Sequence, residues 1–181
     1  NVECSSGTTV VVDETDNVGQ HNSVAIRPNG MPIIAYQDFS SSDLKYAFCN
    51  DVACASADLS AIATGNTGTH IDVMIGFDEL PFIAYRDEGV NALHITHCVD
   101  EKCLTRTSTT VDTSGNTGEH TSVIIGLDGL PVMAYFDRTG DSLKVLHCAV
   151  LNCITSTTTI VDNSGSSGQW PSIIIGSDGN P

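Results

Sequence analysis

The chain has 181 residues, enough for one domain with a hydrophobic core, and its 22 acidic residues outnumber the 7 basic ones to give a formal net charge of −15. This balance argues against nucleic acids and anionic membrane surfaces as partners, because both require clustered Lys and Arg. No apolar run in the sequence approaches the roughly 20 residues that span a bilayer, so membrane insertion is not expected.

The sequence is organised as a repeat. Its clearest landmark is a Gly-x-His or Gly-x-Trp segment, which recurs at steps of 49, 50 and 50 residues and begins at Gly19, Gly68, Gly118 and Gly168. Other columns keep the same phase, namely Pro32, Pro81, Pro131 and Pro181, then Tyr36, Tyr85 and Tyr135, and then Leu44, Leu93 and Leu143. Such a period indicates a chain built from copies of one supersecondary unit.

In chain order, the repeat divides the sequence into five parts. They are a last strand of a preceding unit at 1–13, complete units at 14–63, 64–112 and 113–162, and the start of a further unit at 163–181. Each complete unit contains four strand-like runs separated by turn signals, and none has helical spacing. In the third unit the runs are roughly Thr121–Ile125, Pro131–Phe136, Leu143–His147 and Thr155–Val161.

The first turn of each unit has a sequence that favours a tight hairpin. Asn29-Gly30 and Asp128-Gly129 favour positive φ and predict a two-residue turn. The second unit has Asp78-Glu79 there, so Glu79 is expected either to be strained or to select another turn type.

Four antiparallel strands at a period near 50 residues resemble the blades of a β-propeller. The resemblance implies an all-β fold with three complete four-stranded blades and one strand at each end, the apolar first strand innermost and the Ser/Thr-rich fourth strand outermost. The Trp-Asp dipeptide of WD-type repeats, the double glycine of kelch repeats and the Asp box of sialidases are absent. Because propellers usually have four or more blades, the chain is expected to be part of a longer protein or of an assembly of neighbouring chains.

Six of the seven cysteines form three Cys-x4-Cys pairs around the turn between the third and fourth strands. Facing positions in such a hairpin suit a disulfide, so we predict the bonds Cys49–Cys54, Cys98–Cys103 and Cys148–Cys153. Zinc is the alternative, but a four-coordinate site needs two more ligands per pair. Cys4 is expected to pair outside the chain. Three disulfides imply an oxidising compartment and hence a secreted, extracellular or cell-surface protein.

Counting outward from the two-residue turn places His21 opposite Asp38 and predicts the matching pairs His70–Asp87 and His120–Asp137 at one rim of the blades. These pairs form either a binding or acid–base site or a structural hydrogen bond in each blade. Recurrence in every blade favours the structural interpretation, since a site used once needs asymmetry. Trp170 interrupts the His column as a packing variant or as an aromatic platform for a ligand.

The leading hypothesis is a non-catalytic extracellular scaffold or binding module that contacts a protein or a glycan, with self-association as a further option. The alternatives are a lectin-like or metal-binding propeller that uses the His/Asp rim, and an enzyme with an active site at the channel mouth. No cofactor is indicated, although the Asp/Asn/Ser/Gly-rich loops before the first strands leave calcium open. No phosphate-binding loop, Gly-x-Ser-x-Gly elbow or His-Glu-x-x-His motif occurs.

Overall fold

The computed structural model describes residues 7–181, in which all regular structure is β-strand. The strands form three four-stranded antiparallel sheets in which spatial order follows chain order. The first sheet contains β1 (Val18–Ile26), β2 (Pro32–Asp38), β3 (Asp43–Cys49) and β4 (Ala57–Ala63). The second contains β5 (Thr67–Ile75), β6 (Pro81–Asp87), β7 (Ala92–Cys98) and β8 (Arg106–Asp112). The third contains β9 (Glu119–Ile125), β10 (Pro131–Asp137), β11 (Ser142–Cys148) and β12 (Ser156–Asp162).

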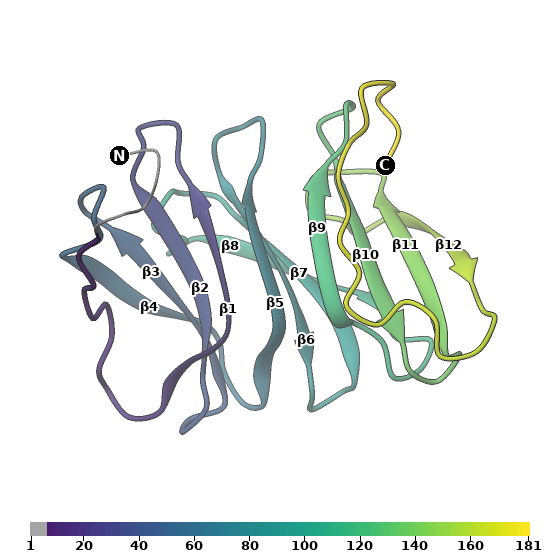
Figure 1. Cartoon of the computed structure of the whole chain (residues 1–181), viewed down its shortest axis with the longest axis horizontal. Coiled ribbons are helices and arrows are strands. Elements are labelled where there is room, and N and C mark those ends of the chain that lie inside the picture. Colours follow the sequence, from purple (N-terminus) through teal and green to yellow (C-terminus); the bar gives the residue numbers. More distant parts are fainter. Residues whose placement is uncertain (1–6) are drawn as a thin grey trace.

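The three sheets stand side by side, and their first strands β1, β5 and β9 are neighbours (Figure 1). The middle strand β10 is buried along its whole length, whereas the Ser/Thr-rich outermost strand β12 is exposed along its whole length. The all-β character and the four-strand composition of each repeat therefore agree with the expectation from the sequence. Among residues 7–181 no helix is present that is long and apolar enough to cross a bilayer.

Two hydrophobic clusters join the sheets. One lies between the first and second sheets around Tyr46 and Ile83, and the other lies between the second and third around Tyr135 and Leu146. Each interface also requires a glycine: a Cβ atom on Gly68 would lie 2.8 Å from the Leu44 Cα atom of the preceding sheet. The same close approach recurs at Gly118 and at Gly168, so residues from 168 onward pack on the third sheet as β5 packs on the first.

Each first hairpin has a three-residue turn, which corrects the expected two-residue turn. Ile26 pairs with Pro32, and the Arg27 N–H donates to the Met31 carbonyl across 3.0 Å, so the turn comprises residues 28–30. Gly30 adopts a φ of +83° in the left-handed position that such a turn requires. Glu79 has the same turn with a φ of +63°, so the sequence expectation of strain at this residue holds.

The three predicted disulfides are confirmed. Cys49–Cys54, Cys98–Cys103 and Cys148–Cys153 have Cα–Cα distances of 4.8, 4.8 and 4.9 Å, and each closes the loop between the third and fourth strands of its sheet. We call the end of the sheets that carries these loops and the first hairpin turns the disulfide end; it is uppermost in Figure 1. Cys4 lies outside the described residues.

Candidate functional site

Each first strand is irregular where the Gly-x-His segment lies. Gly68 and His70 both have positive φ, at +82° and +50°, and the matching residues of the other repeats have similar values. The ladder between β5 and β6 is interrupted between Thr67 and Asp72. Such a bulge removes a side chain from the regular alternation of the strand. The His side chains therefore do not follow the strand alternation from which the sequence predicted the His–Asp pairs.

The predicted cross-strand pairs His21–Asp38, His70–Asp87 and His120–Asp137 do not form. The three-residue turn and the bulge both shift the register, so that Val18 and Thr67 lie opposite Asp38 and Asp87. A shift of one position moves a side chain to the other face, so counting from the wrong turn length was enough to misplace every pair.

The Asp column instead closes the turn between the second and third strands. Each carboxylate accepts hydrogen bonds from backbone N–H groups two and three residues further on; the first of these bonds join Asp38 to Ser40 at 3.0 Å, Asp87 to Gly89 at 2.7 Å and Asp137 to Thr139 at 2.9 Å. This arrangement is an Asx turn, and it explains the recurrence of the column without a ligand.

The His column forms a row of rings. The ring centroids of His21 and His70 are 5.1 Å apart, those of His70 and His120 are 4.6 Å apart, and those of His120 and Trp170 are 4.4 Å apart. We call these four residues the ring row. Trp170 ends it with 73% of its surface exposed. Burial, together with the charges of His120 and His21, lowers the pKa of His70 to about 4, so this imidazole is neutral at physiological pH.

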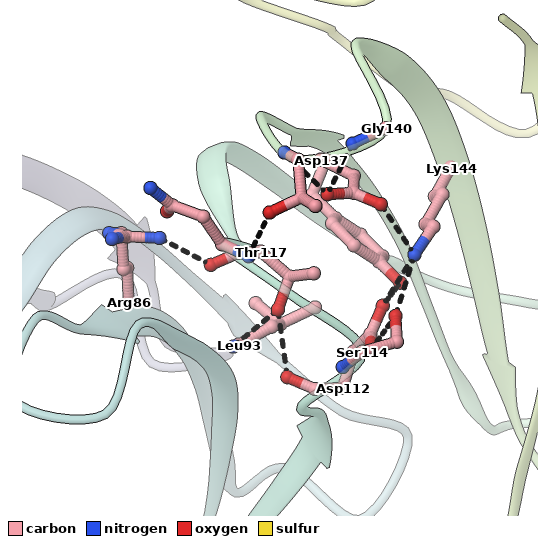
Figure 2. A network of polar contacts seen from close by, with 11 residues as sticks. Arg86, Leu93, Asp112, Ser114, Thr117, Asp137, Gly140 and Lys144 are labelled. Carbon is pink, nitrogen blue, oxygen red and sulfur yellow. Dashed lines mark hydrogen bonds and ion pairs between the residues drawn. The ribbon is translucent and has the colours of Figure 1, made fainter.

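A buried arginine and a glutamate lie beside the ring row. Arg86 is 2% exposed and donates to the Thr117 carbonyl at 2.7 Å (Figure 2), to Asn91 Oδ1 at 2.6 Å and to Glu88 Oε2 at 3.1 Å. The Thr69 hydroxyl donates to the other oxygen of Glu88 at 2.8 Å. Burial acts to raise the pKa of Glu88, but the hydrogen bonds from Arg86 and Thr69 outweigh it and lower the pKa. Glu88 is therefore held as a carboxylate.

A second ion pair lies next to His120. Arg138 Nε is 2.8 Å from Glu119 Oε1, with the Glu119 side chain 9% exposed and that of Arg138 64% exposed. The charges of both Glu88 and Glu119 act on His70, and those of Glu119 and Arg138 act on His120. The ring row and the two ion pairs therefore form one cluster, which is the candidate site.

The charged residues of the cluster do not recur from repeat to repeat. The column that contains Arg86 has Gln37 and Phe136 in the other two repeats, and the column that contains Glu88 and Arg138 has Phe39 in the first. Neighbouring columns keep Tyr, Asp and Leu in every complete repeat. Charged residues that differ between the copies of a repeating scaffold are the pattern expected of a site used once. The sequence signal was present, but only the structure shows that these columns meet.

A polar network joins the second and third sheets, and Figure 2 shows how it continues from Arg86 through Thr117 to Asp112. Asp112 at the end of β8 accepts from the Tyr135 hydroxyl at 2.6 Å and from Lys144 Nζ at 3.2 Å, and Lys144 Nζ is also 2.8 Å from Asp137 Oδ2. Burial acts to lower the pKa of Lys144, but both carboxylates outweigh it and raise the pKa. The network spans a sheet interface with all charges paired, so we assign it a structural role.

The interface between the first and second sheets lacks this network. Ala63 stands in the column of Asp112, and His94 stands in the column of Lys144. His94 Nε2 lies 3.8 Å from Asp87 Oδ2, and burial lowers the His94 pKa. This interface therefore lacks both the carboxylate of the Asp112 column and the ammonium group of the Lys144 column. Loss of only one of them would leave the other charge buried without its partner.

Genuine His–Asp pairs occur at the disulfide end, where sequence reasoning did not place them. His97 Nε2 is 2.8 Å from Asp78 Oδ2, and His147 Nε2 is 2.8 Å from Asp128 Oδ2. Each pair joins the residue before a Cys to the Asp of the first turn. The His97 ring also stacks on Phe82 with centroids 4.2 Å apart, which indicates packing as well as hydrogen bonding.

Metal binding gains no support from these groups. Within residues 7–181 no three His, Cys, Asp or Glu side chains are arranged to hold a metal ion. The loop carboxylates considered for calcium bind their own loops, as Asp112 does with the Ser114 N–H at 2.8 Å and Asp162 with the Ser164 N–H at 2.8 Å.

Comparison with known proteins yields structural matches only: no family model and no curated protein matches the chain. A protein of unknown function from Dyadobacter fermentans has 13% sequence identity and a TM-score of 0.63, over 82% of this chain and 44% of that one. An α-L-arabinofuranosidase from Lactobacillus brevis has 10% identity and a TM-score of 0.56, over 79% of this chain and 53% of that one. A GH43 endo-arabinanase from Bacillus licheniformis has 14% identity and a TM-score of 0.55, over 89% of this chain and 63% of that one.

The chain therefore shares a propeller-like arrangement of four-stranded sheets with these structures. The last two are five-bladed β-propellers. The chain spans between 44% and 63% of the length of these matched structures. At such identities the likeness concerns the fold alone.

Proposed function

We propose that the chain is part of a secreted β-propeller that binds a carbohydrate at the ring row. The observation that carries this proposal is the asymmetric cluster in which the exposed Trp170 packs against the ring of His120, and His120 directly follows Glu119 of the Glu119–Arg138 ion pair. The Asp column, by contrast, recurs in every complete repeat and binds its own turn in each of them.

The chemistry of the cluster suits a sugar. The C–H face of a sugar ring is weakly electropositive and packs on the electron-rich face of an aromatic ring, and Trp170 exposes such a face. Arginine and carboxylate groups donate to and accept from neighbouring hydroxyls with defined geometry. A neutral ligand also avoids the repulsion that an anion would meet on a chain with a net charge of −15.

The propeller itself is supported by the open faces of the outer sheets. Val24 on β1 is 60% exposed, whereas its counterparts Val73 and Val123 are each 5% exposed because the preceding sheet covers them. On the far side Val161 is 57% exposed, whereas its counterpart Ile62 is 4% exposed. Further four-stranded repeats would bury both faces in the way the internal interfaces do. We accordingly propose the blades 14–63, 64–112 and 113–162, with 1–13 and 163–181 belonging to adjacent blades.

Titration with arabino-oligosaccharides and a wider glycan array tests the binding proposal. We expect at least one glycan to bind, and Trp170→Ala to weaken that binding by about tenfold or more, which corresponds to the loss of one aromatic contact. Phe77→Ala is the matched control, because Phe77 is an aromatic residue that is 71% exposed at the opposite end. Equal losses in both variants, or no bound glycan, would overturn the proposal.

A glycoside hydrolase is the second candidate, since two structures with the same fold are named as an arabinofuranosidase and an endo-arabinanase. Glycoside hydrolysis needs two carboxyl groups, one of them able to donate a proton. The lowered pKa of Glu88 suits a hydrogen-bond acceptor rather than a proton donor, which is why we favour binding. Release of reducing sugar from arabinan that is abolished by Glu119→Gln would establish the hydrolase instead.

The three disulfides indicate an oxidising environment, and secretion is the corresponding proposal for localisation. Detection of the protein in the culture medium or on the cell surface, with its cysteines oxidised, tests it.

A further inference from the structure

The disulfide end carries a concentration of exposed apolar side chains. Turn positions usually hold polar residues, yet the first residue of the three-residue turn is Phe77 in the second sheet and Leu127 in the third, at 71% and 72% exposure. The apolar residues exposed at this end are Val52, Phe77, Val99, Leu104, Leu127, Val150, Leu151 and Ile154. An apolar surface that is larger than isolated side chains marks a contact site for another macromolecule.

The apolar side chains of adjacent sheets approach one another. A Cβ atom on Gly129 would lie 3.4 Å from Phe77 Cδ2, so the Phe77 ring reaches the first turn of the third sheet. Leu127 in turn covers Gly179. Between the second and third sheets lies a shallow, open depression lined by His97, Thr107, Leu130, Val150, Leu151 and Asn152. The surface is therefore continuous between the second and third sheets.

The loops at this end are held in place before any partner binds. Besides the Cys49–Cys54 bond, Asp51 accepts from the backbone N–H groups of Ala53 at 2.9 Å, Ala55 at 3.1 Å and Ser56 at 3.2 Å. Asp100 does the same in the second sheet, where it accepts from Leu104 and Thr105. Loops already ordered in this way lose little conformational entropy on binding.

The charges at the disulfide end are almost all negative. Carboxylates are contributed by Asp51, Asp78, Glu79, Asp100, Glu101 and Asp128. Of the three cationic residues there, Arg27 is 4% exposed and pairs with Glu101 at 3.3 Å, Lys102 pairs with Asp58 at 2.7 Å, and Arg106 donates to the Cys103 carbonyl at 2.9 Å. The other four Lys and Arg side chains bind carboxylates within the chain. Carboxylates therefore outnumber cationic groups at this end, which favours a basic partner.

We propose that the disulfide end is a docking surface for a basic, apolar segment of a partner protein, whose aliphatic or aromatic side chains contact Phe77 and Leu127 and whose Lys or Arg side chains face the surrounding carboxylates. This surface lies at the opposite end of the sheets from the ring row, so the inference does not depend on the carbohydrate proposal.

Three synthetic peptides of equal length probe the surface in isothermal titration. A peptide of alternating Lys and Leu residues is expected to bind, a Lys/Ser peptide of the same charge about tenfold more weakly, and a Glu/Leu peptide not at all. Equal binding of the Lys/Leu and Lys/Ser peptides would reduce the effect to unspecific attraction by a chain of net charge −15 and would overturn the proposal.

Variants locate the contact. Phe77→Ser combined with Leu127→Ser is expected to weaken binding of the Lys/Leu peptide about tenfold or more, and Glu79→Gln to weaken it less and mainly at low salt. The control is Val90→Ser, because Val90 is an apolar residue that is 61% exposed at the opposite end. All four side chains are exposed, so the variants should keep the wild-type melting temperature. Equal loss of binding in the control would show that the peptide binds elsewhere and would overturn the proposal.

Discussion

Positive backbone φ angles decide two features of individual residues in this protein. Glu79 occupies the left-handed position that Gly30 and Gly129 fill in the other first turns. His70 has the same type of backbone conformation, and its ring is thereby placed between two other His rings. In both cases the backbone of a non-glycine residue is strained. At His70 this conformation brings the ring against two other rings, whereas Glu79 lies in an exposed turn.

Glu79→Gly is expected to raise the free energy of unfolding by about 1 kcal/mol, because glycine adopts the φ of +63° without steric cost. Chemical denaturation of the variant and the wild type measures this difference. Asp78→Gly is a suitable control, because Asp78 binds His97 and the Leu80 N–H, so its replacement should destabilise. If Glu79→Gly were less stable than the wild type, the assignment of backbone strain to Glu79 would be wrong.

His70 should make the protein less stable in mild acid. Its pKa is lowered from 6.5 to about 4 in the folded state, chiefly by burial, so the unfolded chain takes up a proton first as the pH falls. Stability is therefore unaffected above pH 6.5 and declines between pH 6.5 and 4, by about 1–2 kcal/mol once solvent screening at this half-buried ring is allowed for.

Urea denaturation at pH 7.5 and pH 5 in the wild type and in His70→Gln measures the effect. The variant should lose part of the decline, and the remainder comes from His94 and His120, whose pKa values burial also lowers. An identical decline in both proteins would show that His70 titrates normally.

At the scale of elements, the sheets are joined by two kinds of contact. Apolar clusters fill both internal interfaces, and a glycine at the start of each first strand lets the backbone approach a leucine of the preceding sheet. The second interface adds the network of Asp112, Tyr135, Lys144 and Asp137. A matching network in the first sheet joins Asp13 to Tyr36 at 2.8 Å and to Lys45.

Lys144→Ala should destabilise the protein by about 3 kcal/mol or more, because it leaves two buried carboxylates without a cation. His94→Ala, at the corresponding position of the second sheet, should destabilise the protein less, because it removes only a contact of 3.8 Å to Asp87. Equilibrium unfolding of both variants gives the comparison. The double variant Lys144→Ala with Asp112→Ala is expected to recover part of the loss, and the absence of any recovery would argue against coupling between the two residues.

At the scale of the whole molecule, the outer faces distinguish this chain from a closed ring. Val24 and Val161 are exposed, whereas Val73, in the column of Val24, is buried between sheets. The loss of stability on substitution of Val24 or Val161 therefore reports whether a further sheet covers that valine.

In the chain of 181 residues, Val73→Ala should cost about 2 kcal/mol, and Val24→Ala and Val161→Ala less than about 0.5 kcal/mol. In a longer form that carries further repeats on both sides, all three substitutions should cost about 2 kcal/mol, because each valine would be buried. Thermal unfolding of both forms makes the measurement. Unchanged costs for Val24→Ala and Val161→Ala in the longer form would contradict the propeller.

The sequence by itself was sufficient for the repeat, the four strands of each unit and the three disulfides. These features depend on local patterns: alternation and turn residues define strands, and Cys49 and Cys54 lie five positions apart in one hairpin. Proximity along the chain makes such contacts readable from spacing alone.

Only the tertiary structure decided which side chains meet. The partners of the His and Asp columns depend on the length of the turn at residues 28–30 and on the bulge at His21, and one residue of shift reverses the face on which a side chain lies. The candidate site likewise joins Trp170 to His120 and His120 to His70, residues from different repeats. Lys144 and Asp112 lie 32 positions apart and meet only because two sheets pack together. Spacing within one hairpin carries no information about such contacts, since they are set by how neighbouring sheets pack.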